Sequence, residues 1–196
     1  MSRMPSPQTL AEHARRIVAA WAADCAERVL PLFEAEAPTD RRPREAIART
    51  RSFARGELDT AEEIRRRFAN GGAARDVNNP AAAAAARAAG QAAAVAHMGA
   101  HALGAAAYAA EAAGLAAPDD PEAIAREIDW QLAHMTEPVR AALRQLPPLG
   151  TNRSGPLGPG LLTSGLRGEI IRALQARLAE DHAVRTPRSA GSTRSP

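Results

Sequence analysis

The stretch of sequence that decides the fold is residues 79–114, which read NPAAAAAARAAGQAAAVAHMGAHALGAAAYAAEAAG. Asn79 suits the N-cap of a helix, and Pro80 suits its first turn, where a backbone amide hydrogen would have no partner. Alanine is the strongest helix former, and Gly114 provides the stop. We therefore predict one long alanine-rich helix from Pro80 to Ala113, about 50 Å in length, as the spine of the fold.

The composition extends this helical pattern to the rest of the chain. Alanine accounts for 49 of the 196 residues, whereas aromatic residues make up 3%. Runs of β-branched residues are nearly absent, which argues against a sheet protein. Because the net charge is only +3, the shortage of large apolar residues indicates closely packed helices rather than a disordered, highly charged chain. The predicted fold class is all-α, an irregular antiparallel helical bundle around the long helix.

Proline, glycine and capping residues divide the chain into segments. A helix with one apolar face begins near Thr9, and Pro31 should end or kink it because proline lacks an amide hydrogen and clashes with the preceding turn. After Pro147 most positions are Gly, Pro, Ser or Thr, as in a linker, and a helical pattern returns from Leu166. The sequence leaves open whether this last helix docks on the core.

The predicted organisation is a disordered lead, an α-helical domain, a Gly/Pro-rich linker, an extra helix and a disordered tail. These segments cover residues 1–7, 8–147, 148–165, 166–183 and 184–196, respectively. The segments after the domain are expected to form a flexible C-terminal extension, and its tail is expected to be disordered because it has no apolar anchor.

Three features bear on the cellular compartment. The single Cys25 excludes an intramolecular disulfide framework and fits a reducing environment. The first residues lack the apolar stretch of a secretory signal. Residues 92–110 contain no formally charged side chain, but they are mostly alanine and include two histidines, so we expect no membrane-spanning helix. Together these features predict a cytoplasmic protein without a membrane partner.

All 25 basic residues are arginine, which gives a sequence pI of about 10.2. The arginine-rich runs at residues 41–51 and 65–67 could bind phosphates, so a nucleic-acid-binding accessory protein is one alternative function. However, 22 acidic residues are interleaved with the arginines. Neither aromatic interleaving nor a helix-turn-helix signature accompanies the runs. A solvated helix face is therefore the default, and nucleic acid is not an expected partner.

The long predicted helix carries the most informative side chains. At 100° per residue, one stripe of its surface holds His97, His101 and Tyr108, together with glycines that allow close helix approach. Histidines four residues apart can bind one metal ion, so a metal-binding or hydrolytic helical protein is a second alternative. The sequence HMGAH has no Glu after its first histidine, so the zincin motif is absent. The main interpretation is that both histidines make hydrogen bonds in a helix contact, and no catalytic residue or cofactor is assigned.

The first helix carries a second candidate site. Asp24 and Arg28 lie four residues apart, so they could form an ion pair beside the indole of Trp21. Tryptophan and arginine are the residues most often found at interface hot spots. The main interpretation, however, is a buried tryptophan beside an ordinary ion pair. The candidate partner-binding residues are Trp21, Asp24, Arg28, His97, His101 and Tyr108.

Four blocks of sequence resemble the Imm-5-like domains, a family of proposed immunity proteins from actinobacteria and their relatives. The blocks are WAADCAERVLPLFE at 21–34, DRRPREAI at 40–47, AAGQAAAVAH at 88–97 and HALGAAAYAA at 101–110. Their order and spacing match over about residues 8–147, whereas the segment 60–79 departs from the family pattern.

The resemblance implies a function as well as a fold. Imm-5-like domains are α-helical and are proposed to neutralise a toxin in competition between bacteria. The family has no established enzymatic activity, so the resemblance assigns no catalytic set to this chain. It therefore implies a non-enzymatic protein whose partner is a cognate toxin. Because the alanine-rich core has few bulky side chains, a homodimer that completes the core is an alternative state.

Overall fold

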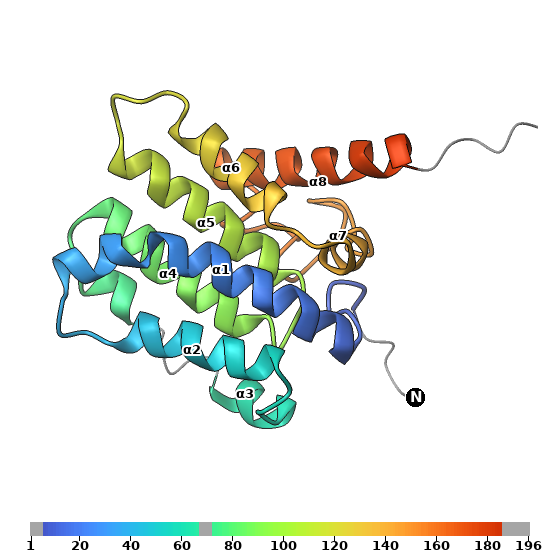
Figure 1. The fold of residues 1–196 in the computed structure, drawn as a ribbon, viewed down its shortest axis with the longest axis horizontal. Helices are drawn as coiled ribbons and strands as arrows, with labels where there is room; N and C mark the ends of the chain where they lie inside the picture. Colours follow the sequence, from blue (N-terminus) through green and yellow to red (C-terminus); the bar gives the residue numbers. More distant parts are fainter. Residues whose placement is uncertain (1–5, 67–71, 186–196) are drawn as a thin grey trace, which may run out of the picture.

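The computed structural model describes residues 6–66 and 72–185, and within these ranges it contains helices and no strand (Figure 1). The elements are α1 (Glu12–Glu36), α2 (Arg42–Ala54), α3 (Thr60–Arg66), the short 3₁₀ helix η1 (Ala73–Arg75), α4 (Pro80–Ala94), α5 (His101–Ala116), α6 (Ala123–Ala133), α7 (Glu137–Leu143) and α8 (Gly165–Arg185). The all-α prediction is confirmed. The lead and tail predicted to be disordered fall largely outside the described residues.

The prediction of one continuous spine is wrong, because the alanine-rich stretch folds into two helices, α4 and α5, which pack against each other. The connection, residues 95–100, is held by the N-terminal segment 8–10. Gly99 and Ala100 donate backbone hydrogen bonds of 2.9 and 3.0 Å to two carbonyls of that segment. A side chain at Gly99 would place its Cβ 2.5 Å from Leu10 Cδ1, so the absence of a side chain lets Leu10 pack there.

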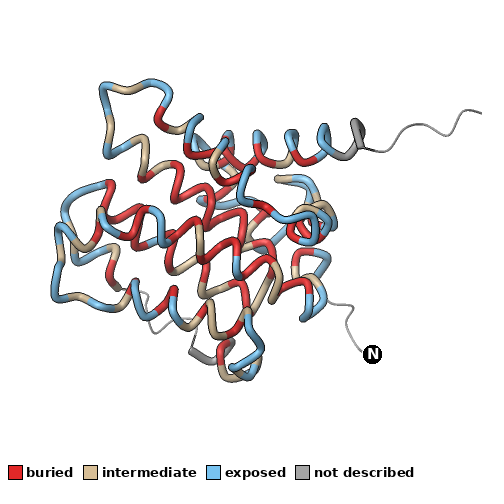
Figure 2. The backbone as a smooth tube through the Cα atoms, in the orientation of Figure 1, coloured by how far each residue is buried: buried red, intermediate tan, exposed pale blue. Residues whose placement is uncertain are grey.

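The core is built around α5, which contacts α1, α4, α6 and α8. Its residues 102–110 are all buried, and most of them are alanine. Small side chains let neighbouring helix backbones approach closely, and larger residues such as Trp21, Phe33 and Leu103 fill the remaining space. Figure 2 shows the resulting band of buried residues along α4 and α5 through the middle of the molecule.

The local start signal of the alanine-rich stretch is confirmed. The side chain of Asn79 accepts hydrogen bonds from the backbone N–H groups of Ala81 and Ala82 at 2.8 and 3.3 Å, and Pro80 opens α4. The prediction that Pro31 ends or kinks the first helix fails as an end, because α1 continues to Glu36 with Pro31 inside it. The residues around it, including Val29, Leu30 and Phe33, are buried, and this burial offsets the hydrogen bond that proline cannot donate.

The C-terminal helix α8, whose docking the sequence left open, packs on the core. Its apolar residues Ile170, Ile171, Leu174 and Leu178 are buried, and α8 contacts α5 and α6. The expectation of a flexible extension is therefore wrong for the described part of this helix. Its apolar side chains recur at three- and four-residue steps and bury a continuous stripe, which an exposed appendage would leave in water.

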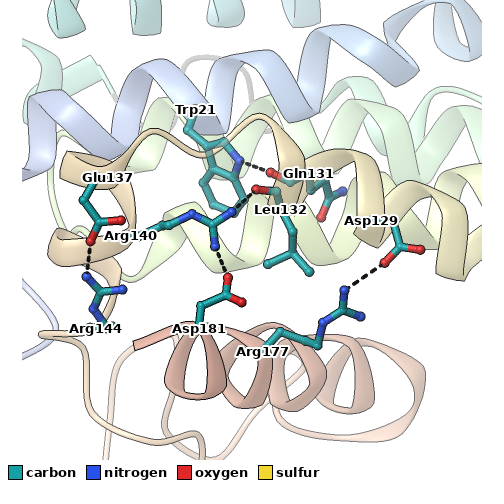
Figure 3. Close-up of polar contacts among 9 residues, drawn as sticks. All are labelled: Trp21, Asp129, Gln131, Leu132, Glu137, Arg140, Arg144, Arg177 and Asp181. Carbon is teal, nitrogen blue, oxygen red and sulfur yellow. Dashed lines mark hydrogen bonds and ion pairs between the residues drawn. The ribbon is translucent and has the colours of Figure 1, made fainter. Parts of the chain in front are cut away.

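Polar contacts also hold α8 and the segment before it. Arg140 on α7 bonds to the carbonyl oxygen of Leu132 on α6 and to the carboxylate of Asp181 on α8 (Figure 3). In the segment predicted to be a linker, Leu157 is fully buried and its N–H donates a 2.9 Å hydrogen bond to Gln8 Oε1. The C-terminal region is thus tied to α6, α7 and the N-terminal segment. None of the described helices is both long and apolar enough to cross a membrane.

Candidate functional site

One exposed group gathers where side chains of α1 and α6 meet, and we call it the α1–α6 cluster. It consists of Asp24, Glu27 and Arg28 from α1, and of Trp130 and His134 from the end of α6. These five residues line a hollow of about 470 Å³. Helical spacing explains the grouping, because side chains three and four residues apart lie on one face of a helix.

The indole of Trp130 forms the centre of the α1–α6 cluster. The guanidinium carbon of Arg28 lies 4.4 Å from the ring centroid, and the imidazole of His134 stacks on the ring with centroids 4.0 Å apart and planes 22° apart. Two hydrogen bonds fix these partners. Arg28 Nε donates to Glu127 Oε2 at 2.7 Å, and His134 Nδ1 donates to the carbonyl oxygen of Trp130 at 2.8 Å. The half-buried indole is therefore held in one orientation between the guanidinium of Arg28 and the imidazole of His134.

Charge is distributed unevenly around the indole. Asp24 and Glu27 both form ion pairs with Arg51 of α2, the first at 2.8 Å. The side chains of Asp24 and Arg28 are 41% and 43% exposed, whereas that of Glu127 is 5% exposed. The three carboxylates of Asp24, Glu27 and Glu127 face two guanidinium groups, those of Arg28 and Arg51, which leaves one carboxylate in excess. The cluster thus offers an aromatic surface with acidic groups at its rim.

The structure separates the residues that the sequence placed together on the first helix. The predicted Asp24–Arg28 pair is wrong, because Asp24 pairs with Arg51 and Arg28 with Glu127. Trp21 is 1% exposed, and its Nε1 donates a 3.0 Å hydrogen bond to the carbonyl oxygen of Gln131 (Figure 3). Trp21 is therefore a core residue, which corrects its candidacy for partner contact, while Asp24 and Arg28 are at the exposed cluster.

Sequence reasoning missed Trp130 and His134 as candidate site residues. Trp130 served only to mark the apolar pattern of its helix, and His134 carried no interpretation. A signal was present, because the two residues lie four apart, which places them on the same face of one helix. Their proximity to Arg28 depends on how α6 packs beside α1, and the sequence of either helix alone does not contain this information.

The two histidines of the alanine-rich stretch do not share one helical stripe, although His101 makes the kind of helix contact that was predicted for both. His97 lies in the connection 95–100 rather than on a helix, so the continuous stripe is broken. His101 opens α5, where its Nδ1 donates a 2.8 Å hydrogen bond to Gln91 Oε1 on α4. Burial, aided by the charge of His97, lowers the pKa of His101 to about 4, and the two rings lie 6.5 Å apart.

These histidines lack the surroundings of a metal site. Across residues 6–66 and 72–185, no group of three His, Cys, Asp or Glu side chains is placed to hold a metal ion. Metal sites with protein ligands use three or four such groups. Tyr108, the third member of the predicted stripe, is buried on α5 with the guanidinium of Arg167 5.1 Å from its ring centroid. His101 and Tyr108 thus belong to helix contacts.

The arginine run on α2 is largely paired with carboxylates. Its ion pairs are Arg41–Glu45, Arg42 with Asp40 and Asp76, Arg44–Glu34, Arg49–Glu63, and Arg51 with Asp24 and Glu27. These carboxylates offset the positive field that phosphate binding would need. Of the second run, Arg67 and the side chains of Arg65 and Arg66 lie outside the described residues.

Cys25, the single cysteine, is not a candidate nucleophile. It is fully buried, and burial, together with the charges of Glu127 and Asp24, raises the pKa of its thiol well above the ordinary range. A reactive cysteine needs the opposite, an accessible sulfur with a lowered pKa.

Comparison with known proteins identifies the family of the chain. No curated protein and no solved structure matches the chain. The model of one family, described as Imm-5 like putative immunity protein, matches residues 8–138. The match begins at the N-terminal segment, includes both halves of the α1–α6 cluster and ends in the first turn of α7, so that α8 lies outside it. Two thirds of the chain are covered, and the protein belongs to the Imm-5-like immunity protein family.

Proposed function

We propose that this chain is a non-enzymatic immunity protein that binds a cognate toxin protein in the cytoplasm and neutralises it. Family membership supports an immunity role. The observation that carries the proposed contact site is the half-buried Trp130, held against Arg28 and His134 at the surface shared by α1 and α6.

The α1–α6 cluster has the chemistry of an interface hot spot. Tryptophan and arginine dominate such spots, and they act best where a rim of other residues excludes water. Because Trp130 is already fixed by Arg28 and His134, little further side-chain ordering is needed when a partner covers it. Asp24 and Glu27 at the rim favour a toxin surface that presents Lys or Arg opposite them.

Co-expression with a toxin encoded beside the gene tests this proposal. The wild-type chain should protect a sensitive host from the toxin, and Trp130→Ala should weaken binding about 30-fold, the effect of losing a hot spot of about 2 kcal/mol. The matched control is Leu161→Ala, which removes an apolar side chain that is 71% exposed elsewhere on the surface. A Leu161→Ala variant should protect like the wild type.

A charge reversal separates loss of contact from loss of folding. Asp24→Lys reverses a rim carboxylate and removes its 2.8 Å ion pair with Arg51, so we expect it to weaken protection while thermal unfolding loses no more than about 1 kcal/mol, which leaves the chain folded. The proposal is wrong if no neighbouring toxin is neutralised. The proposed site is wrong if Trp130→Ala and Asp24→Lys protect as well as Leu161→Ala does.

A further inference from the structure

A second cavity, away from the α1–α6 cluster, is lined by arginine, amide and phenol side chains and by no carboxylate among its described lining residues. It has a volume of about 380 Å³ and lies between η1, α4 and α5. Its polar lining residues are Arg75, Arg87, Gln91 and Tyr108, and Gly90 forms part of its wall. We call it the Arg87 cavity. Its volume falls within the range of about 300–1,000 Å³ that is typical of small-molecule sites.

Three of these side chains have unused hydrogen-bonding capacity. Within the described residues, Arg87 forms no ion pair or hydrogen bond, although most of the other arginines described do. Gln91 uses Oε1 to accept from His101, which leaves the two N–H groups of its Nε2 without a partner in the same part of the chain. The hydroxyl of Tyr108 likewise makes no hydrogen bond there, and the residue is 4% exposed.

The fold fixes the position of the Gln91 amide. Gly104 brings α5 close to α4 at this point, since a Cβ on it would lie 2.4 Å from Gln91 Oε1 and 2.9 Å from Leu162 Cδ1. The bond to His101 then orients the Gln91 amide. At Gly90 an added Cβ would meet nothing within 4 Å, so the cavity wall is open there.

The electrostatics favour an anion. No carboxylate lines the Arg87 cavity in the described part of the chain. Glu111, on the same helix as Tyr108, forms a two-oxygen ion pair with Arg167 at 3.0 Å and so contributes little net field. Guanidinium groups match the oxygens of phosphates and carboxylates, and amide and hydroxyl donors add directional hydrogen bonds.

We propose that the Arg87 cavity is a binding site for the oxyanion group, phosphate or carboxylate, of a small molecule. Arg87 supplies the charge, and Gln91 Nε2 and the Tyr108 hydroxyl donate hydrogen bonds that orient the ligand. The site is independent of the toxin contact, because it lies between η1, α4 and α5, whereas the α1–α6 cluster is formed by other helices.

The single tyrosine of the chain makes a direct test possible. With tyrosine labelled by ¹³C at the ε carbons, the NMR spectrum contains one tyrosine signal, which reports on the cavity. Titration with inorganic phosphate should shift this signal saturably, and sodium chloride of equal ionic strength should not. Acetate in a parallel titration identifies the preferred oxyanion, since a phosphate site should saturate at a lower concentration with phosphate.

Two arginine variants decide whether the cavity binds the anion. Arg87→Gln should weaken phosphate binding at least ten-fold, because a charge-assisted hydrogen bond is lost. The matched control is Arg41→Gln, which removes an arginine whose side chain is 75% exposed and which has only a 4.0 Å ion pair. This control should bind like the wild type. The proposal is overturned if phosphate and acetate both leave the signal unshifted, or if Arg87→Gln and Arg41→Gln bind equally well.

Discussion

The pair Arg28–Glu127 links α1 to α6, and its removal should destabilise the protein measurably. The carboxylate of Glu127 is nearly buried, whereas Arg28 is close to half exposed. In Arg28→Met the unbranched side chain can still cover Trp130, but Glu127 keeps only a 3.4 Å hydrogen bond from Gln131 Nε2. The variant thus tests the cost of leaving one charge buried without its counterion.

The stability lost in Arg28→Met lies between two limits. Breaking a fully buried ion pair costs about 3–5 kcal/mol, whereas an exposed pair contributes about 0.2–1 kcal/mol. Water can reach the Arg28 side of this pair, so we expect about 2 kcal/mol, including the lost cation–π contact with Trp130. For a protein of this size, that corresponds to a decrease in melting temperature of about 4–8 °C.

Thermal and urea unfolding, followed by circular dichroism, measure this loss. The second substitution Glu127→Gln, made in the Arg28→Met background, should restore about 1 kcal/mol because a neutral amide needs no counterion. Arg41→Met is the control for removing an exposed arginine and should change stability by less than about 0.5 kcal/mol. If Arg28→Met is as stable as Arg41→Met, or if Glu127→Gln brings no recovery, the Arg28–Glu127 pair does not stabilise the protein as proposed.

Three further predictions concern single residues. His101 has a pKa of about 4 in the folded protein, so that between pH 6.5 and 4 only the unfolded chain binds a proton there. Lowering the pH across this window should therefore cost about 3 kcal/mol of stability. The stability of His101→Gln, measured by urea titration at the two pH values, should decline less, and an equal decline would contradict the assignment. Asn79→Ala should cost about 1 kcal/mol by removing the N-cap of α4, whereas Asn78→Ala, as a control, should have little effect on the urea midpoint. Arg140→Ala should raise amide hydrogen exchange in α8 about ten-fold, because it removes the bonds to α6 and α8, and unchanged exchange in α8 would show that apolar packing alone holds this helix.

Local signals predicted the parts of the fold that local chemistry determines. The N-cap at Asn79 and the start at Pro80 follow from hydrogen bonding and backbone geometry within four residues. The end of α4 at Ala94 does not follow from such local chemistry. Most of the connection 95–100 is compatible with a helix, and what stabilises the turn is the distant segment 8–10, which accepts two backbone hydrogen bonds there. A non-local contact of this kind has no signature within the alanine-rich stretch.

The candidate site was likewise predicted where local spacing determines it and missed where helix packing determines it. The sequence placed Asp24 and Arg28 on one face of the first helix, and both line the α1–α6 cluster. It also placed Trp21 on that face, where the structure buries it against Gln131. Trp21 and Trp130 both lie on amphipathic helices, and which of them faces solvent depends on how α1 and α6 pack. The sequence pattern alone therefore identified the helix but not the exposed aromatic residue.

Calorimetric titration of the purified chain with the toxin encoded beside its gene is the decisive test of toxin binding at the α1–α6 cluster. We predict a one-to-one complex whose dissociation constant rises about 30-fold in Trp130→Ala and stays unchanged in Leu161→Ala. We also expect weaker binding as salt is raised, because the acidic rim of the cluster faces basic groups of the toxin. Equal dissociation constants for the wild type and Trp130→Ala would contradict the claim that this cluster is the centre of the contact.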